Sequence, residues 1–184
     1  MPSVLIPLAE GFEELEAVTL IDLLRRAEIE VVTAGLAAGP VVASRGTVLV
    51  PDTSLDEVMD QDFDMIVLPG GLPGAHHLDE DARVHALLRR HHASQRYTAA
   101  ICAAPKVLAN AGLLDGRSAT WYPGAVAEAD YPRVSLRLAP VVVDGQVVTS
   151  RGPGTAMDFA LTLIGLLTDE MRQREVEQQL QRED

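Results

Sequence analysis

The only cysteine of the chain, Cys102, ends an apolar segment at 97–102 that is typical of a buried strand. A helix is predicted directly after it, over 103–113. A thiol at that position faces the positive end of the helix and its unpaired N–H groups, which stabilise a thiolate and lower its pKa. Free cysteine is also among the residue types most often buried in cores. The pattern therefore allows either a nucleophile at a strand end or a cysteine that only fills space.

A second candidate is a carboxyl group on a helix predicted over 12–27. On a helical wheel the apolar residues of this segment form one broad arc, and both Glu13 and Glu16 fall inside it. Glu13 lies in the first turn, where the helix dipole favours a carboxylate, whereas Glu16 lies deeper and has no such explanation. A buried carboxyl without a cationic partner tends to be protonated and to donate a hydrogen bond. Glu16 is therefore expected to be a proton partner for a reactive group, unless it is a boundary residue that reaches water.

Two glycine-rich turns are placed where a ligand would meet the backbone. Gly70 and Gly71 end the LPGG segment at 68–71, and such a turn lets N–H groups point at a ligand as an oxyanion hole does. The RGPGT segment at 151–155 precedes a predicted helix, where it is either an anion site or, as we expect, a tight structural turn. Neither matches a phosphate-binding loop or a dinucleotide fingerprint. No cofactor is predicted.

The histidines do not form a recognisable metal motif. His76-His77 and His91-His92 are adjacent pairs, without His-x3-His or HExxH spacing and without nearby cysteines. We expect both pairs to be solvated at the surface and His85 to lie at the boundary of a helix face. No metal site is predicted.

Strands and helices are predicted to alternate along the chain, which favours parallel βαβ units. The predicted strands are 3–9, 29–35, 63–71 and 97–102, a two-stranded excursion over 41–51 around Arg45-Gly46, and a hairpin over 140–150 with Asp144-Gly145 as a type I′ turn. The predicted helices are 12–27, 52–59 (opened by capping residues), 80–93, 103–113 and 155–167, with 168–184 as a polar tail or surface helix that frays at its end. The fold class predicted is α/β: a doubly wound, mostly parallel sheet with helices on both faces, in one domain over 1–184.

Composition narrows the function classes. The formal net charge of −12 opposes nonspecific binding to nucleic acid or to anionic lipid. A single cysteine cannot form an intrachain disulfide, and the N-terminal apolar run is too short for a signal peptide or membrane span. The expectation is a cytoplasmic protein that binds neither nucleic acid nor membrane.

The sequence resembles the ThiJ/PfpI superfamily and, within it, the branch of the Parkinson-disease protein DJ-one and its bacterial relatives. The resemblance covers nearly the whole chain and is carried by five motifs in the same order. They are EGFEELEAVTLIDLLRRA (10–27), VVASRG (41–46), DMIVLPGG (64–71), AAICAAP (99–105) and VVTSRGPGTAMDFAL (147–161). It implies a flavodoxin-like α/β/α sandwich that acts as a homodimer, with a reactive cysteine at a strained nucleophile elbow.

The resemblance also implies roles for single residues. Cys102 matches the nucleophile, and Glu16 matches the glutamate that, when protonated, hydrogen-bonds the cysteine sulfur. Gly71 and Ala103 match the backbone donors near that sulfur. Arg45 and Arg151 match arginines near the site and the dimer interface, and Gly70 and Tyr122 are expected at the pocket.

Two departures from the family pattern weaken a Cys-His mechanism. Some branches carry a histidine directly after the cysteine, where this chain has Ala103. The DJ-one protein has a histidine in the segment that corresponds to 119–124, where this chain has Tyr122. Tyr122 is expected either to donate a hydrogen bond to substrate or only to close the pocket.

Three functions follow as alternatives. The first is a cofactor-independent enzyme that acts on reactive carbonyls, of glyoxalase or deglycase type, through Cys102 and Glu16. The second is a redox-responsive protective protein or chaperone in which Cys102 is oxidised to the sulfinate. The third, a cysteine hydrolase, needs a histidine near Cys102.

Overall fold

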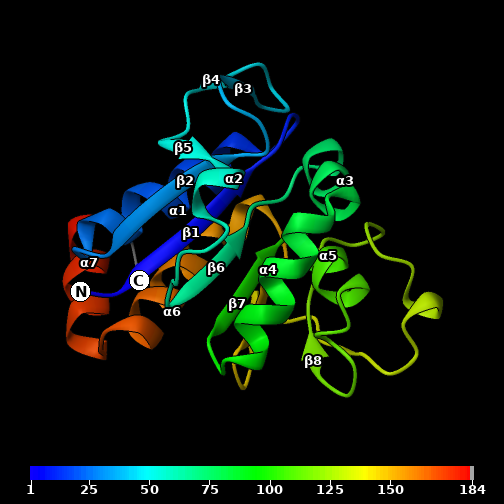
Figure 1. The fold of residues 1–184 in the computed structure, drawn as a ribbon. Coiled ribbons are helices and arrows are strands. Elements are labelled where there is room, and N and C mark those ends of the chain that lie inside the picture. The colour runs from blue at the N-terminus through cyan, green and yellow to red at the C-terminus, as the bar shows by residue number, and fades with distance from the viewer. Residues whose placement is uncertain (183–184) are drawn as a thin grey trace.

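A seven-stranded, mostly parallel sheet forms the centre of the computed structural model, which describes residues 1–182 (Figure 1). Its strands are β1 (Ser3–Leu8), β2 (Glu30–Gly35), β5 (Thr53–Ser54), β6 (Met65–Leu68), β7 (Tyr97–Ile101), β10 (Val141–Asp144) and β11 (Val147–Ser150). They lie in the order β10-β11-β7-β6-β1-β2-β5, and every neighbouring pair is parallel except β10 and β11. The five-strand order β2-β1-β6-β7-β11 is that of the flavodoxin-like fold. The predicted fold class is confirmed.

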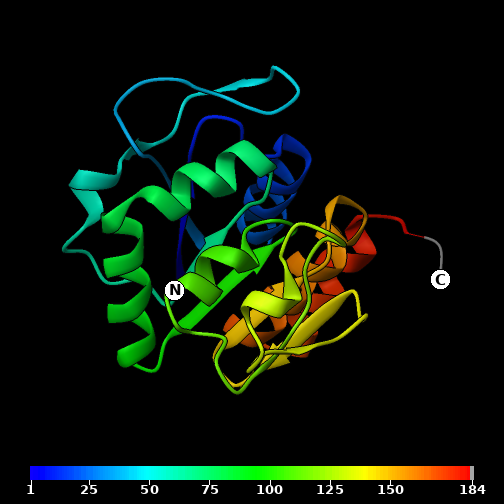
Figure 2. The same ribbon diagram turned by 90° about the vertical axis from the view of Figure 1, so that its right-hand side faces the viewer.

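Helices cover both faces of this sheet (Figures 1 and 2). One face packs against α1 (Glu14–Arg26), α6 (Ala156–Leu167) and α7 (Glu170–Gln179). The other packs against α2 (Leu55–Val58), α3 (Leu72–Glu80), α4 (Ala82–Ala93) and α5 (Pro105–Asn110). The chain therefore builds two hydrophobic cores, one on each side of the sheet.

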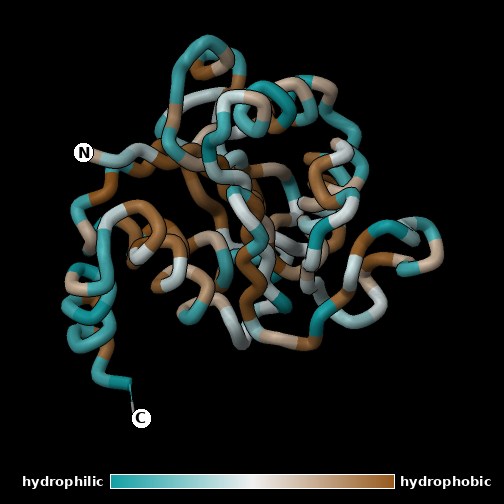
Figure 3. Tube along the Cα trace, turned by 90° about the horizontal axis from the view of Figure 1, so that it is seen from below, coloured by the Kyte–Doolittle hydropathy of each residue, from teal (hydrophilic) through white to brown (hydrophobic). Residues whose placement is uncertain are grey.

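The side-chain alternation of β1 explains why there are two cores. Successive residues of a strand point to opposite faces, so Val4, Ile6 and Leu8 enter the core beneath α1 and α6. Leu5 enters the core beneath the helices on the other side. All four are fully buried. In Figure 3 the hydrophobic segments accordingly lie mainly at the centre of the molecule, while α7 is mainly hydrophilic.

The helix α3 is not predicted by the sequence pattern. It begins with Leu72-Pro73-Gly74, residues that normally interrupt helices, but Pro73 lies in the first turn, where its missing N–H would have no partner in any case. Gly74 is required by packing, because a Cβ there would lie 2.7 Å from the backbone of Phe12. The other helices agree with the prediction in place but are shorter at one or both ends.

The prediction that capping residues open the 52–59 helix is wrong. Asp52 does not cap α2. Its carboxylate instead accepts hydrogen bonds from the backbone N–H and the hydroxyl of Thr33, at 2.9 and 2.8 Å. The N-cap residue Ser54 makes no capping bond with its side chain. The segment is thus fixed to β2 by Asp52 rather than by a cap.

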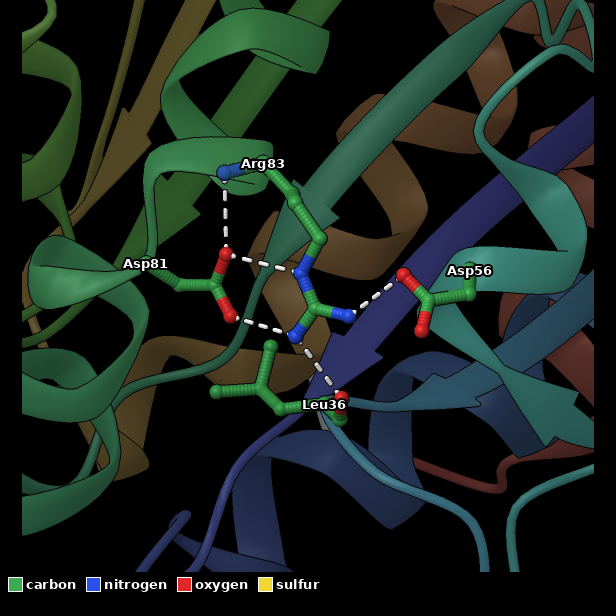
Figure 4. A network of polar contacts seen from close by, with 4 residues as sticks. All are labelled: Leu36, Asp56, Asp81 and Arg83. Carbon is green, nitrogen blue, oxygen red and sulfur yellow. Dashed lines mark hydrogen bonds and ion pairs between the residues drawn. The ribbon is translucent and has the colours of Figure 1, made fainter.

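Arg83 joins three elements of the α2–α4 side (Figure 4). Its guanidinium donates to both carboxylate oxygens of Asp81, the N-cap of α4, at 2.6 and 3.0 Å. It also donates to Asp56 in α2 and to the carbonyl oxygen of Leu36 after β2, at 2.6 and 2.8 Å. A forked guanidinium that meets carboxylates in this way forms strong, directional bonds. The network fixes the start of α4 against the sheet edge.

The two predicted hairpins are present, and one has a different turn. β3 (Val41–Val42) and β4 (Val48–Leu49) pair antiparallel around Arg45-Gly46, as predicted. In the other hairpin Asp144 pairs directly with Val147, so the turn residues are Gly145 and Gln146, and only Gly145 has a positive φ. A type I′ turn at Asp144-Gly145 is therefore wrong, because that turn needs two positive φ angles. Two short segments, β8 (Ser118–Ala119) and β9 (Ser135–Leu136), form a separate pair.

The prediction that both histidine pairs are solvated is wrong for the second pair. His76 and His77 are exposed, but only 4% of His91 is exposed and His92 is half-buried. Burial and the nearby cations of Arg96 and Arg90 lower the pKa of His91 to about 4. The imidazole of His91 is thus a neutral core group of α4, because the apolar face of this helix extends to its last turn.

The tail forms the surface helix α7, while residues 183 and 184 of the predicted tail lie outside the described residues. Within residues 1–182, no helix is both long enough and apolar enough to cross a membrane. In the same part of the chain, no three or more His, Cys, Asp or Glu side chains are grouped to hold a metal ion.

Candidate functional site

The candidate site lies where the parallel strands end. Cys102 directly follows β7, and Gly70 and Gly71 follow β6 after one proline. Glu16 lies in the first turn of α1, the helix that follows β1. Because the carboxyl ends of parallel strands share one edge of the sheet, these residues meet there although they are far apart in sequence.

Cys102 has a backbone conformation that few residues adopt. Its φ is +66°, in the left-handed region that costs a residue with a side chain on the order of 1–2 kcal/mol. Two backbone hydrogen bonds hold it: the N–H of Cys102 donates to Ser150 in β11 at 3.0 Å, and the N–H of Tyr122 donates to the carbonyl of Cys102 at 2.9 Å. The strained elbow implied by the resemblance is therefore present. It turns the thiol away from the strand and into a cleft.

The two glycines after β6 allow other groups to come close. A Cβ at Gly70 would lie 2.6 Å from the Cβ of Cys102 and 2.6 Å from Oε2 of Glu16. Gly71 has a φ of +88°, and a Cβ there would lie 2.4 Å from the carbonyl oxygen of Gly11. Neither position has room for a side chain. The absence of a Cβ at Gly70 is what lets the carboxyl and the cysteine share one small space.

Glu16 is the buried carboxyl that the helical wheel predicts. Its exposed fraction is 0%, and Oε2 accepts a hydrogen bond of 2.7 Å from the N–H of Gly70. The other oxygen, Oε1, is buried without a hydrogen-bond partner of good geometry. Burial raises the pKa of Glu16 to about 7, against the opposing effects of the Gly70 N–H and the Cys102 thiol. The alternative of a boundary glutamate that reaches water is thereby wrong.

The pKa of Cys102 moves opposite to the prediction made from helix position. Burial, followed by the charge of the Glu16 carboxylate, raises the pKa of the thiol to about 12, although the N–H groups of Gly71 and Ala103 act in the other direction. The helix that follows, α5, has only six residues and begins at Pro105, so its dipole is a weak source of stabilisation. The negative charge of the ionised glutamate therefore opposes formation of the thiolate.

Glu16 and Cys102 are best treated as one titrating pair. Above about pH 7 the pair holds one negative charge, because removal of a second proton would put two charges in a buried space. Because the pKa of Glu16 is lower than that of Cys102, this charge resides mainly on the carboxylate, and the tautomer with a thiolate and a protonated Glu16 is the minor one. The N–H groups of Gly71 and Ala103 favour the sulfur. A protonated Glu16 beside a thiolate is thus accessible without a second charge.

The cleft above the thiol has a volume of about 360 Å³ and is mostly apolar. Its walls come from the start of α1, the β3–β4 turn, the start of α3, the segment after β8 and the turn before α6. The lining residues are Glu13, Ser44, Arg45, Gly71, Leu72, Pro73, Cys102, Ala103, Tyr122, Ala125 and Pro153. Among these residues there is no histidine.

The remaining predicted site residues are divided between two neighbouring spaces. Arg45 is exposed and lines the cleft, where its backbone N–H is bound by the Glu14 carboxylate at 3.0 and 3.1 Å. Tyr122 also lines the cleft and is 49% exposed. Arg151 does not line it. This arginine lines an adjacent hollow that also contacts Tyr122, and its guanidinium donates to the carbonyl of Leu138 at 3.0 Å.

The RGPGT segment is a self-contained turn, as predicted. The hydroxyl of Thr155 accepts a hydrogen bond from the N–H of Gly152 at 3.1 Å and lies 2.9 Å from its carbonyl oxygen. The hydroxyl of Ser150 meets the same oxygen of Thr155 at 2.7 Å. These bonds use the polar groups of the turn internally.

Several lining residues are missed by the sequence reasoning. Ser44 donates a hydrogen bond of 3.0 Å to the carboxylate of Glu13. From the sequence, the position of Glu13 on the apolar arc had been explained by the helix dipole alone. Leu72 and Pro73 directly follow the LPGG segment, so an extension of that motif would have found them. Ala125 and Pro153 carry no chemical signal and are brought to the cleft by the loops that contain them.

Comparisons with known proteins identify relatives of this chain. The model of the DJ-1/PfpI family matches residues 2–166. Protein dj-1beta of Drosophila melanogaster is 44% identical over 177 residues, which cover 95% of this chain and 94% of the relative. A crystal structure of the Drosophila melanogaster DJ-1beta superposes with a TM-score of 0.93 at 42% identity and covers 97% of both chains.

A further relative is named for an activity. The glutathione-independent glyoxalase DJR-1.2 of Caenorhabditis elegans is 36% identical over 166 residues. The match covers 89% of this chain and 87% of that protein.

The burial of Glu16 predicts a specific pH dependence of stability. Between pH 4.5 and about 7 the unfolded chain releases the Glu16 proton while the folded chain keeps it, so the free energy of unfolding falls as the pH rises. We expect the difference in this free energy between wild type and Glu16→Gln to fall by about 3 kcal/mol from pH 4.5 to pH 8. Urea unfolding of both proteins at a series of pH values, with Cys102 kept reduced, measures it. Stability curves that run parallel would refute a buried, proton-holding Glu16.

Proposed function

Because the chain belongs to the DJ-1/PfpI family, we propose that it is a cysteine-dependent, cofactor-independent enzyme that acts on reactive carbonyl compounds. One observation carries the proposal. Three kinds of group meet at the Cys102 side chain, which lines a cleft: the thiol itself, the buried Glu16 carboxyl, and the N–H groups of Gly71 and Ala103. They supply a nucleophile, a proton carrier and oxyanion donors. The name of the Caenorhabditis elegans relative supports a glyoxalase-type reaction.

The reaction begins with the tautomer that has a proton on Glu16 and the charge on Cys102. The thiolate adds to the aldehyde carbon of an α-oxoaldehyde, and the N–H groups of Gly71 and Ala103 stabilise the oxyanion. Glu16 donates its proton to that oxygen, which completes a hemithioacetal. The Glu16 carboxylate is then a base in an apolar pocket, beside the C–H bond of the former aldehyde carbon.

The second half is an internal oxidation and reduction. The Glu16 carboxylate removes the hydrogen of the former aldehyde carbon, and the electron pair moves to give an enediolate. Glu16 returns the proton to the neighbouring carbon, while the hydroxyl proton of the first carbon passes to the second oxygen. The aldehyde carbon is now a thioester and the ketone carbon an alcohol. Water hydrolyses the thioester, releases the Cys102 thiol and yields a 2-hydroxy acid.

The assay uses methylglyoxal, which this reaction converts with one water molecule to lactate. We expect wild type to form lactate, Cys102→Ser to form none above the uncatalysed rate, and Glu16→Gln to lose at least about 100-fold in kcat, since it removes the proton carrier. Lactate is measured by enzymatic assay or NMR. Absence of lactate with the wild type, or equal rates with Cys102→Ser, would disprove the proposal.

A deglycase-type reaction would use the same groups on an adduct between methylglyoxal and an amine. The two reactions differ in what the thiolate attacks. An assay on preformed adducts from which unreacted methylglyoxal has been removed distinguishes the two reactions. A glyoxalase consumes only the aldehyde released by the adduct, so its rate is limited by that release, whereas a deglycase exceeds it.

The hydrolase alternative has no support from the lining of the cleft. Of the two candidate bases, His77 uses Nδ1 in a contact of 2.9 Å with the carbonyl oxygen of Glu10 and lines a different pocket. His76 meets Glu80 at 3.3 Å on the exposed side of α3. Neither lines the Cys102 cleft.

A second candidate function is redox response, favoured by the partial exposure of Cys102 and by the N–H groups directed at its sulfur. Oxidation of the thiolate to a sulfinate would place acceptor oxygens where the amides of Gly71 and Ala103 and a protonated Glu16 donate. This function requires Cys102 to be in the reduced form before it meets the oxidant, and the reducing conditions of the cytoplasm maintain that form.

Mild peroxide treatment tests this function. We expect mass spectrometry to show two added oxygen atoms on Cys102 in the wild type, and further oxidation to the sulfonate in Glu16→Gln, which holds the sulfinate less well. If Cys102 stays unmodified, or if both proteins oxidise to the same end product at the same rate, the redox function is wrong.

We also propose a homodimer, in keeping with the family resemblance. Apolar side chains are exposed on α1 and on the β3–β4 hairpin: Leu15, Val18, Val48 and Val50, with exposed fractions of 51%, 46%, 58% and 71%. Glu14 joins the two elements through hydrogen bonds to the hairpin. Such a surface favours association with a second apolar surface.

The dimer is tested by light scattering after size exclusion. Val18→Arg is expected to shift the protein to the monomer mass, because it places a charge in the apolar surface. Val143→Arg on β10 is the matched control, since Val143 is equally exposed at 46% on another element. A monomeric wild type, or a dimer that survives Val18→Arg, would contradict this interface.

A further inference from the structure

The size of the cleft points to a larger substrate than methylglyoxal. Pockets that enclose small-molecule ligands start at about 300 Å³, and the Cys102 cleft has about 360 Å³. A three-carbon dicarbonyl bonded to the sulfur would leave most of this space to water. The unfilled part is available to a substituent on the ketone carbon.

The wall that this substituent would meet is apolar. Leu72 and Pro73 at the start of α3, Tyr122 and Ala125 after β8, and Pro153 before α6 all line the cleft. Leu72 is 68% exposed and Tyr122 49%, so both have apolar surface that a ligand can cover.

The polar lining on the other side is already engaged. Glu13 and Ser44 are hydrogen-bonded to each other at 3.0 Å. Besides the Glu13 carboxyl, the charged side chain of the lining is Arg45, which is exposed. A flat apolar substituent therefore suits the interior of the cleft better than a charged one.

Tyr122 is the best-positioned member of this wall. Its N–H is bonded to the carbonyl of Cys102 at 2.9 Å, so its backbone is fixed to the elbow. Its ring lies over Gly152, where a Cβ would be only 3.0 Å from Cδ2. Tyr122 lines both the Cys102 cleft and the adjacent hollow of Arg151.

We propose that the enzyme prefers α-oxoaldehydes whose ketone carbon carries a flat apolar group, and that the Tyr122 ring is the residue that sets this specificity. The inference rests on the proposed glyoxalase-type function and adds a substrate class to it. The bonds made and broken are those of the methylglyoxal reaction. With phenylglyoxal as the probe, one water molecule is consumed and mandelate is formed.

The experiment compares phenylglyoxal with methylglyoxal in initial-rate assays that detect mandelate and lactate. Cys102→Ser, run in parallel, corrects for uncatalysed reaction, including consumption of phenylglyoxal by arginine side chains. We expect the wild type to have a kcat/KM for phenylglyoxal at least about tenfold above that for methylglyoxal, since one well-packed apolar group provides discrimination of this order. The difference should lie mainly in KM, because the ring packs equally against ground state and transition state.

Variants at Tyr122 separate the ring from its hydroxyl group. Tyr122→Ala should lower the phenylglyoxal-to-methylglyoxal ratio of kcat/KM about tenfold. Tyr122→Phe retains the ring and should keep the ratio within about threefold of wild type. Val143→Ala, a truncation of an exposed apolar residue on β10, controls for nonspecific effects and should leave the ratio unchanged.

Each outcome bears on a defined claim. If neither substrate is converted, the proposed function and this inference both fail. If methylglyoxal is converted but phenylglyoxal is not preferred, only the substrate class is wrong. If Tyr122→Phe loses the preference as Tyr122→Ala does, the hydroxyl rather than the ring selects the substrate, and the assigned role of the ring is overturned.

Discussion

The coupling between Glu16 and Cys102, which together hold at most one buried negative charge, is the interaction on which the site depends. Glu16 is fully buried and Cys102 is only partly exposed, and burial raises the pKa of each. Two charges in this space would repel strongly, so the pair behaves as a single acid over the physiological range. The N–H group of Gly70 stabilises the charge on the carboxylate, and the N–H groups of Gly71 and Ala103 stabilise it on the sulfur. In the proposed reaction, nucleophile and base arise from one proton that moves between these two groups.

The fold provides this pair through backbone positions more than through side chains. The left-handed Cys102 is held from both sides, by Ser150 in β11 and by the segment at Tyr122. Gly71 has a positive φ, and the carbonyl oxygen of Gly11 occupies the space that a Cβ at Gly71 would need. These constraints come from the ends of adjacent parallel strands, and the strand order sets which turns meet. The sheet therefore acts as the rigid frame that the strained elbow needs.

The sequence predicted the frame and the central pair because both depend on strong local patterns. Buried strands such as β1 and β6 are continuous apolar runs, and Glu16 is the carboxyl within an apolar arc whose burial nothing else explained. The pKa of Cys102 was predicted in the wrong direction, since burial of the thiol, followed by the charge of Glu16, outweighs the backbone N–H groups, and spacing along the chain reveals neither. His91 was misplaced for a related reason: the apolar face of α4 extends further than its polar ending suggests. α3 was missed because Pro73 and Gly74 serve packing at the helix start.

Gly70 has a consequence for how relatives of this chain are interpreted. A homologue could retain the glutamate and the cysteine, along with every surrounding motif, and yet carry a larger residue at the position of Gly70. A Cβ there would occupy the space that the two functional groups now share. Such a protein would have the recognisable signature but not the paired chemistry. Before a function is transferred from one family member to another, the residue at the position of Gly70 should therefore be checked ahead of the two residues that bear the reactive atoms.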